Sequence, residues 1–343
     1  MDRLFDSKTR IVLIGFGVVG QNLAKLLLSR NEDLYALYGM KPRLIAVVDS
    51  KGSVISTSGL DLQKLLDVKK ATGTVAKYEN GGKKDVEEII ESVDAEVLLE
   101  LSPTNLKTGE PGMFNITTAI KKGMNVITTN KGPLALALPS LIELAEYNNV
   151  MLRFSGTVGG GTPILEFAKR CLKGDRIRSF RGILNGTTNY ILTKMEEGLT
   201  FNDALADAKK NGYAEADPSL DVDGYDAAAK LVIMANWVMN MKVTMQDVKF
   251  TGIRDVTVSD MKNALKKNNA IKLIASSNKE LTVRPIEVAK NDPLCVKGTL
   301  NAVTFSLEYS GYQTIIGRGA GGIETASAVL RDLIEIREAI SRA

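Results

Sequence analysis

Groups that can transfer a proton gather in a short stretch past the middle of the chain. Lys230 follows five acidic residues within twelve positions, and these are Glu215, Asp217, Asp221, Asp223 and Asp226. Asp226 and Lys230 stand four residues apart, before the apolar run 231–235, so they share one face of a predicted helix. Burial on so apolar a helix would favour the neutral amine of Lys230, whereas the carboxylate would favour the ammonium. That balance suits a proton donor, although an ordinary stabilising ion pair has the same spacing.

A glycine turn near the N-terminus has the form G-x-G-x-x-G, with Gly15, Phe16, Gly17, Val18, Val19 and Gly20 in order. It leaves an apolar run at 11–14 and opens a predicted helix at 19–29. In this context the glycines allow a tight turn, close approach of a pyrophosphate and packing of helix on strand. The free N–H groups at the start of the helix would then bind the anion. The turn therefore predicts a dinucleotide site.

The choice between NAD and NADP stays open at the end of the next predicted strand. The carboxylate of Asp49 there could accept hydrogen bonds from the ribose and repel a 2′-phosphate, which favours NAD. Ser50 and Lys51 follow directly and could instead hold that phosphate. Lys51 could equally be an ordinary solvent-exposed lysine of a loop, with no contact to the cofactor.

Two more segments concentrate polar residues. The first is Thr128-Thr129-Asn130-Lys131-Gly132-Pro133, which follows a predicted strand, where ligands of open α/β sheets bind. Lys131 could therefore reach both nicotinamide and substrate, with a solvated loop lysine as the alternative. The second is Asn185-Gly186-Thr187-Thr188-Asn189-Tyr190, in which Thr187 is predicted to cap a helix.

The composition excludes several function classes. The 343 residues include no histidine, which rules out serine-histidine triads, cysteine-histidine proteases and His-ligated zinc. A net charge of +4 does not indicate nucleic acid or an anionic membrane as a partner. Cys171 and Cys295 are isolated, which fits a reducing cytoplasm better than a disulfide framework. The polar N-terminus does not resemble a signal peptide, and no apolar run is long enough for a membrane span.

Strands alternate with helices in the first part of the chain and come in blocks later. The predicted strands there are 11–14, 44–48, 97–101, 125–128 and 151–154, with helices at 19–29, 112–122 and 138–147. This alternation predicts a doubly wound parallel sheet. The second part has predicted helices at 163–172, 187–196, 202–210 and 225–239, and strands at 178–184, 271–275, 281–288, 302–307 and 314–316. Such blocks predict an α+β domain, before a last helix at 325–343.

Taken together in this order, the motifs resemble homoserine dehydrogenases, in the short form without an ACT or aspartate kinase domain. The resemblance covers nearly the whole chain. It rests on the glycine turn with E-L-S-P-T-N at 100–105, T-T-N-K at 128–131, T-V-G-G-G-T-P-I at 157–164, N-G-T-T-N-Y-I at 185–191, Y-A-E-A-D-P at 213–218, D-V-D-G-Y-D-A-A-A-K at 221–230 and G-R-G-A-G-G-I-E-T-A at 317–326.

The resemblance implies an α/β enzyme. Residues 1–152, completed by 313–343, would form a Rossmann dinucleotide-binding domain, with the C-terminal helix returning to it. Residues 153–312 would form an α+β domain for substrate binding and dimerisation. The implied reaction is the reversible NADPH- or NADH-dependent reduction of L-aspartate 4-semialdehyde to L-homoserine, on the path to threonine, methionine and isoleucine.

The resemblance also implies roles for residues. Lys230 would be the general acid and base, and Lys131 would lie beside nicotinamide and substrate and stabilise the charge on the reacting oxygen. Glu215 would pair with the substrate ammonium, and Asp226 would orient substrate and Lys230. The remaining matches are substrate-pocket positions Thr187, Tyr213 and Asp221 and cofactor positions Ser102 and Gly321.

One position departs from the family. A glutamate that helps to frame a sodium site is replaced here by Ser155. The backbone carbonyls of Val158, Gly160 and Thr162 could still coordinate the cation, but the anionic ligand is missing. We therefore do not expect a firmly occupied sodium site.

Two other functions remain as alternatives. An aspartate-semialdehyde dehydrogenase would use a cysteine nucleophile assisted by histidine, and the chain has no histidine. A non-catalytic NAD(P)-binding protein would bind cofactor without turnover, and the set Lys131, Glu215, Asp226 and Lys230 argues against it. For a dehydrogenase of this family the partner is its small-molecule substrate, and a homodimer is expected.

Overall fold

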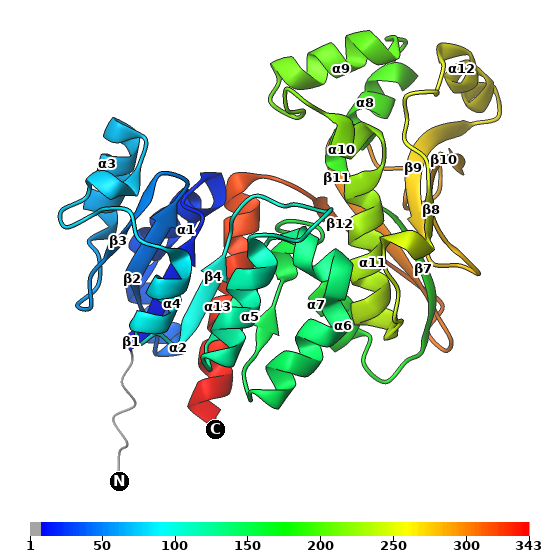
Figure 1. Cartoon of the computed structure of the whole chain (residues 1–343). Coiled ribbons are helices and arrows are strands. Elements are labelled where there is room, and N and C mark those ends of the chain that lie inside the picture. The colour runs from blue at the N-terminus through cyan, green and yellow to red at the C-terminus, as the bar shows by residue number, and fades with distance from the viewer. Residues whose placement is uncertain (1–7, 343) are drawn as a thin grey trace. The chain divides into compact units, whose positions relative to one another are not determined.

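The computed structural model describes residues 8–342 (Figure 1). The chain divides into two compact units. The first unit comprises Met1–Thr157 with Thr325–Ala343, and the second comprises Val158–Glu324. Each unit is built around one six-stranded sheet.

The sheet of the first unit has the strand order β3-β2-β1-β4-β5-β6. Its strands are β1 (Lys8–Ile14), β2 (Lys41–Asp49), β3 (Gly52–Ile55), β4 (Val97–Glu100), β5 (Asn125–Thr128) and β6 (Leu152–Arg153). All neighbours pair in parallel except β2 and β3, which form an antiparallel hairpin. The chain order reverses between β1 and β4, and ligands of doubly wound folds bind at such a switch point.

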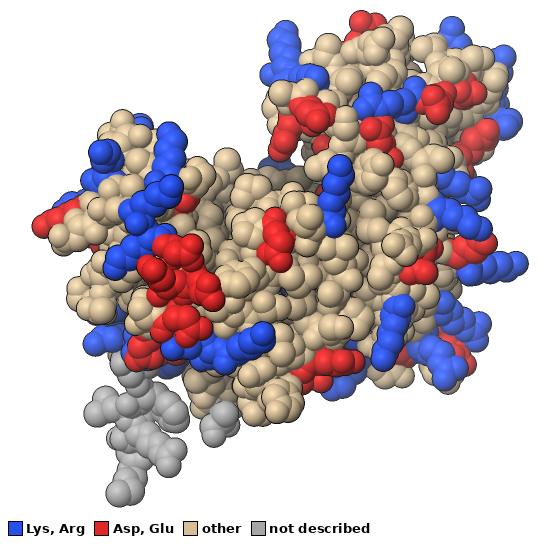
Figure 2. All heavy atoms as spheres, in the orientation of Figure 1, with Lys and Arg blue, Asp and Glu red and all other residues tan. Residues whose placement is uncertain are grey.

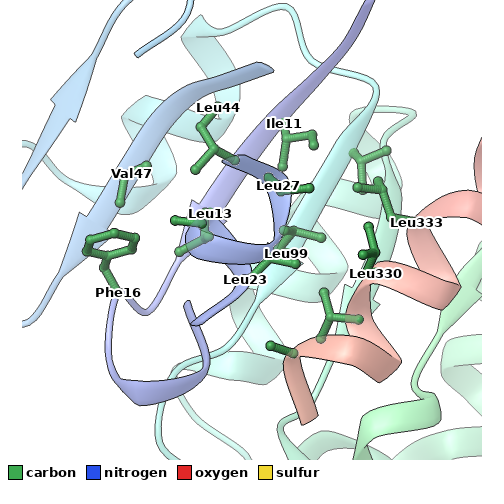
Figure 3. Packing of buried hydrophobic residues seen from close by; sticks show 14 of the residues in the cluster. Ile11, Leu13, Phe16, Leu23, Leu27, Leu44, Val47, Leu99, Leu330 and Leu333 are labelled. Carbon is green, nitrogen blue, oxygen red and sulfur yellow. The ribbon is translucent and has the colours of Figure 1, made fainter. Parts of the chain in front are cut away.

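Helices connect these strands and cover the sheet. They are α1 (Val18–Ser29), α2 (Asn31–Tyr38), α3 (Leu62–Thr72), α4 (Val86–Ser92), α5 (Gly112–Lys121), α6 (Lys131–Tyr147) and the C-terminal α13 (Gly322–Arg342). In Figure 3, Leu23 and Leu27 of α1 and Leu330 and Leu333 of α13 pack with strand residues in one buried cluster. This packing confirms the predicted Rossmann-type domain and the return of the last helix to it.

The second unit has the strand order β12-β11-β7-β9-β10-β8. Its strands are β7 (Ile177–Ile183), β8 (Val248–Phe250), β9 (Asn269–Ser276), β10 (Leu281–Ala289), β11 (Leu300–Leu307) and β12 (Tyr312–Arg318). The pairs are antiparallel except β8 with β10. The expected return to the first domain at residue 313 falls inside β12, which pairs with β11 in this second sheet.

Helices of the second unit come in blocks between these strands, as predicted for an α+β domain. They are α7 (Ile164–Glu166), which continues as a π-helical turn (Phe167–Cys171), α8 (Gly186–Glu196), α9 (Phe201–Lys210), α10 (Ser219–Val222), α11 (Tyr225–Met239) and α12 (Val258–Lys266). Every residue of α11 from Ala227 to Ala235 is buried. That helix therefore gives a rigid support to any side chain it carries toward a site.

Charged side chains of both signs are interspersed on the face shown in Figure 2. This distribution agrees with the small net charge of +4. Within residues 8–342, no helix combines the length and the apolar character that crossing a membrane would need.

Candidate functional site

The glycine turn of the first unit has the geometry that the motif predicted. Gly15 has a φ of +100°, and a Cβ there would lie 2.5 Å from the carbonyl of Leu101. A Cβ on Gly20 would lie 2.6 Å from the carbonyl oxygen of Gly15. A Cβ on Gly17, by contrast, would meet no protein atom within 4 Å. Gly15 and Gly20 are thus required by packing, whereas Gly17 faces open space.

Gly17 is also the N-cap residue of α1, and no side chain caps this helix. The first N–H groups of an uncapped helix can bind a phosphate, and the positive end of the helix dipole favours the anion. The turn therefore fits the pyrophosphate of a dinucleotide, with Phe16, Val18 and Val19 supplying backbone beside it.

Asp49 does not have the role that the sequence suggested. Its carboxylate accepts hydrogen bonds from the backbone N–H groups of Lys51 (2.9 Å), Gly52 (3.1 Å) and Val75 (2.8 Å). It also accepts from the hydroxyl of Thr74 (3.0 Å) and from Nζ of Lys69 (2.6 Å). A carboxylate has about four lone-pair sites, so these five donors leave none for a ribose hydroxyl.

The burial and the charge of Asp49 also indicate a structural role. The Asp49 side chain is only 3% exposed. Burial raises its pKa, but the hydrogen bonds from Lys69, Lys51, Val75 and Thr74 outweigh burial and hold the pKa below its ordinary value. Asp49 is therefore an ionised structural group, and the expectation that it accepts the ribose hydroxyls is corrected. Ser50 and Lys51 are both exposed in the turn beside it.

The structural role of Asp49 can be tested by Asp49→Asn. The amide cannot accept from all five donors, and it leaves Lys69 half-buried without an anion, so we expect unfolding to become easier by about 3 kcal/mol. The ratio of kcat/KM for NADP to that for NAD should change less than about threefold, because the acceptor sites of Asp49 are already occupied by donors of the protein and none is left for the ribose. Thermal denaturation and initial rates with both cofactors check this. An unchanged Tm with a selective loss of NAD use would show that Asp49 binds the ribose.

Lys131 is the first residue of α6, directly after β5. Asn130 caps α6, because its side-chain Oδ1 accepts the N–H of Gly132 at 3.1 Å. The backbone N–H of Lys131 donates to the hydroxyl of Thr104 at 3.2 Å. The 100–105 segment after β4 is thus tied to the start of α6, at the carboxyl end of both strands.

Lys230 of the second unit is 7% exposed on α11. Its Nζ lies 2.6 Å from Oδ2 of Asp226 and donates to the carbonyl oxygen of Leu184 at 2.8 Å. An ammonium has three N–H donors. Among residues 8–342, these two groups are its only acceptors, so one donor remains for a ligand. The predicted pair on one helix face is present and is largely buried.

Asn185 joins two carboxylates beside this lysine. Its Nδ2 donates to Oδ1 of Asp221 at 2.6 Å and to Oδ2 of Asp226 at 2.8 Å. Burial, followed by the charge of Asp226, raises the pKa of Asp221 above its ordinary value. Because the shared amide holds the two carboxylates together, Asn185 is a functional candidate that the sequence analysis missed.

Asn185 also corrects the predicted helix cap. Its Oδ1 accepts the N–H of Thr188 at 2.8 Å, so Asn185 is the N-cap of α8 and Thr187 lies inside the helix. The Thr187 hydroxyl instead donates to the carbonyl oxygen of Tyr213 at 2.7 Å. The rings of Tyr213 and Tyr190 have centroids 4.7 Å apart. Thr187 and Tyr213 are therefore adjacent.

The other expected residues occupy loops. Glu215 is exposed in the segment after α9. Gly321 lies just before α13 with a φ of +136°, where a Cβ would lie 2.0 Å from Oε2 of Glu324.

The expected cation loop is a tight turn in the second unit. Val158 is buried, Gly160 has a φ of +53°, and the Thr162 hydroxyl donates to the carbonyl oxygen of Arg318 at 3.1 Å. In the first unit, the backbone N–H of Ser155 donates to Oδ2 of Asp332 at 2.9 Å, and its hydroxyl donates to Oδ1. No cluster of three or more acidic or cysteine side chains suited to a metal occurs among the described residues.

Comparisons with known proteins point to one family. Residues 163–334 match the model of the homoserine dehydrogenase family, and residues 3–104 match that of glutamate/leucine/phenylalanine/valine dehydrogenases. A homoserine dehydrogenase of Methanocaldococcus jannaschii is 46% identical, over 95% of this chain and 98% of its own. An NAD(+)-dependent homoserine dehydrogenase of Pseudomonas canavaninivorans is 38% identical, over 97% of both chains.

The solved structures agree with the sequence relatives. A hyperthermophilic archaeal homoserine dehydrogenase in complex with NADPH superposes with a TM-score of 0.83 and 30% identity. The superposition covers 96% of this chain and 97% of that one. The similarity therefore extends over both units.

Proposed function

Since the chain belongs to the homoserine dehydrogenase family, we propose that it interconverts L-aspartate 4-semialdehyde and L-homoserine with Lys230 as its general acid and base. This is an NAD(P)-dependent oxidoreductase reaction at a CH–OH group, in the biosynthesis of threonine, methionine and isoleucine. The observation that carries the role of Lys230 is its buried ammonium, which has one N–H donor left after Leu184 and Asp226.

The proton transfer follows from the surroundings of Lys230. The bound cofactor supplies a hydride to the aldehyde carbon. Lys230 donates a proton to the aldehyde oxygen as that oxygen gains negative charge, which forms the hydroxyl of homoserine. Asp226 stabilises the ammonium before transfer, and the lysine recovers its proton from solvent. In the oxidation direction, the neutral amine of Lys230 takes the hydroxyl proton.

The remaining site residues have supporting roles in this proposal. Lys131 stabilises the charge that develops on the reacting oxygen. Glu215 pairs with the substrate ammonium, Asp226 orients substrate and Lys230, and Asp221, Thr187 and Tyr213 line the pocket. The cofactor contacts are Gly15, Phe16, Gly17, Val18, Val19, Gly20, Ser50, Lys51, Ser102, Lys131 and Gly321.

The cofactor is NAD or NADP. One relative is named as NAD(+)-dependent and another was solved with NADPH. Asp49, the group that would repel a 2′-phosphate, is paired with Lys69 at 2.6 Å in this chain. We therefore propose that both cofactors are used.

The proposed reaction is tested by identifying the product made from aspartate 4-semialdehyde. We expect homoserine, formed with NADPH or NADH and without any need for phosphate. Formation of an acyl phosphate from the semialdehyde with an oxidised cofactor would instead show the chemistry of an aspartate-semialdehyde dehydrogenase. Cofactor binding without either product would show a non-catalytic protein.

The amide bridge of Asn185 is tested by Asn185→Asp. Aspartate keeps the N-cap of α8, but it cannot donate to Asp221 and Asp226. We expect kcat to fall by about tenfold or more, the equivalent of a charged hydrogen bond of about 1.5 kcal/mol. The Tm should also fall, although the cap remains, because a third carboxylate beside Asp221 and Asp226 adds like-charge repulsion at a largely buried position. A variant with wild-type kcat would mean that the two carboxylates need no bridge.

Three further properties belong to this proposal. A homodimer is favoured because two-fold pairs are the commonest oligomers, and Tyr312 and Ile316 expose apolar surface on the edge strand β12. Sedimentation equilibrium distinguishes it from a monomer.

A cytoplasmic location suits the free thiols of Cys171 and Cys295, and cell fractionation tests it.

A sodium ion at the carbonyls of Val158, Gly160 and Thr162 would bind weakly, because that turn supplies no carboxylate of its own. No catalytic step in the proposal depends on it. Activity should be the same in sodium-free buffer, and a large loss there would show that the cation is needed.

A further inference from the structure

Glu100 is a buried carboxylate that the proposed reaction does not use. It is the last residue of β4 and has no exposed surface. Its Oε1 accepts the backbone N–H of Ser102 at 2.9 Å and also the Ser102 hydroxyl. Its Oε2 accepts Nδ2 of Asn115 on α5 at 2.7 Å. In every one of these contacts Glu100 accepts the hydrogen bond.

The network continues from Ser102 to the start of α6. The Ser102 hydroxyl oxygen accepts Nδ2 of Asn130 at 3.3 Å, and the same Nδ2 donates to the carbonyl oxygen of Pro103 at 3.2 Å. Asn130 is fully buried and caps α6. The next residue is Lys131, whose backbone N–H reaches Thr104 at 3.2 Å. A chain of hydrogen bonds thus leads from Glu100 to the turn that carries Lys131.

The backbone of the same residues closes this network. The carbonyl oxygen of Glu100 accepts the hydroxyl of Thr128 at 3.0 Å, and that hydroxyl oxygen accepts the N–H of Asn130 at 2.9 Å. Gly112 of α5 packs so closely that a Cβ there would lie 2.5 Å from Nδ2 of Asn130. These contacts hold Asn130 in one position. Ser102, which Glu100 orients, accepts a hydrogen bond from its side chain, and Thr128 accepts one from its backbone N–H.

Structural need alone does not account for a carboxylate here. Burying a charge is costly unless it is fully hydrogen-bonded, and an apolar residue would end a buried strand at less cost. Burial does raise the pKa of Glu100, while hydrogen bonds from Ser102, Asn115 and Asn130 oppose that rise. The carboxylate orients Ser102, because it accepts hydrogen bonds from both the backbone N–H and the hydroxyl of that residue. It does so at the carboxyl end of β4, beside the switch point between β1 and β4.

We propose that Glu100 is a positioning residue, which holds Ser102 and the first turn of α6 in the geometry that cofactor binding and Lys131 require. This inference rests on the proposed dehydrogenase function only for the role of Lys131. The link between Glu100 and Ser102 concerns the cofactor position itself, so it can be measured by cofactor binding without turnover.

The experiment compares Glu100→Ala, Glu100→Gln and Ser102→Ala in the full chain. Glu100→Ala leaves Ser102 and Asn115 without their acceptor, and we expect a rise of about tenfold or more in Kd for NADP and NAD and a fall in kcat. Glu100→Gln can keep its carbonyl oxygen on Ser102 if the amide of Asn115 turns over, so it should restore most of the affinity. In a Ser102→Ala background, Glu100→Ala should have a much smaller effect, because the two residues act together.

Asn125→Ala is the matched control. Asn125 is also buried in this sheet, where its side chain donates to the carbonyl oxygen of Glu96 at 3.2 Å and accepts the N–H of Met151 at 2.9 Å. It stands at the opposite end of β5 from Lys131. We expect Asn125→Ala to lower the Tm as Glu100→Ala does, but to leave Kd and kcat within twofold of wild type.

Calorimetric titration with NADP and NAD, together with thermal denaturation, decides the matter. If Glu100→Ala and Asn125→Ala lower the Tm alike and neither changes Kd, Glu100 is a structural residue only and the proposal is wrong. If Glu100→Ala does not fold, Glu100→Met replaces it, because methionine fills a similar volume without offering an acceptor: a Kd within twofold of wild type overturns the proposal, and a rise of about tenfold supports it. A wild-type protein that binds cofactor but does not oxidise homoserine would contradict the proposed function, while the Kd values would still test Glu100.

Discussion

Replacing Lys230 with methionine is expected to abolish homoserine oxidation while NAD and NADP still bind. Methionine fills the volume of the lysine stem on α11 but can neither donate nor accept the proton. General acid–base catalysis is worth about 10²- to 10⁴-fold, so kcat should fall by at least about a hundredfold. Initial rates measure the loss in turnover, and calorimetric titration measures cofactor affinity.

A second buried lysine provides the control for this variant. Lys272 of β9 is fully buried, and its Nζ donates to Oδ1 of Asn189 at 3.1 Å. Burial lowers the pKa of Lys272, which means that the buried environment destabilises the charged form of this side chain. Lys272→Met should therefore leave kcat within twofold and stability equal or higher. If both variants lose turnover alike, the effect of Lys230→Met is a general effect of losing a buried lysine in the second unit.

Gly17→Ala is expected to weaken cofactor binding with little effect on folding. A Cβ at Gly17 meets no protein atom within 4 Å, so the methyl group stands in the open space beside the uncapped start of α1. That space is where backbone approach to a pyrophosphate is needed. We expect KM for NAD and NADP to rise by tenfold or more, while the Tm stays within a few degrees of wild type.

Gly20→Ala gives the opposite pattern and serves as the comparison. Its Cβ would lie 2.6 Å from the carbonyl oxygen of Gly15, so the turn must shift and the Tm should fall by several degrees. Initial rates at varied cofactor and thermal denaturation separate the two variants. An unchanged KM for NAD and NADP in Gly17→Ala would mean that the glycines of this turn serve only the packing of the protein and not cofactor binding.

Local patterns in the sequence were sufficient for the sheet core and for the Lys230 pair. The strands β1, β4 and β5 each contain a short apolar run that is buried on both faces, and these runs are visible in the sequence. Asp226 and Lys230 are neighbours on one helix face, so a spacing of four residues was enough. Short elements with few buried residues were missed, such as α2, in which only Leu34 is buried.

Contacts between distant residues could not be predicted in this way. Asp49 ends an apolar strand and looked available to a ribose, yet Lys69 and Val75, 20 and 26 positions later, occupy its oxygens. Asn185 meets Asp221 and Asp226 across 36 and 41 positions. Its helix-capping preference was a local signal for position 185, but the bridge to two aspartates depends on how α8, α10 and α11 pack together. The missing histidine, in contrast, was informative at once, because it excluded an imidazole as the acid or base and a His-ligated zinc.

The most direct test of the account is the initial rate of L-homoserine oxidation by the wild-type protein, followed as formation of reduced nicotinamide with NAD and with NADP in parallel. We predict saturable turnover with both cofactors, and its loss in Lys230→Met. Absence of turnover with either cofactor, in a folded protein that binds them, would contradict the assignment of this chain as a lysine-dependent homoserine dehydrogenase.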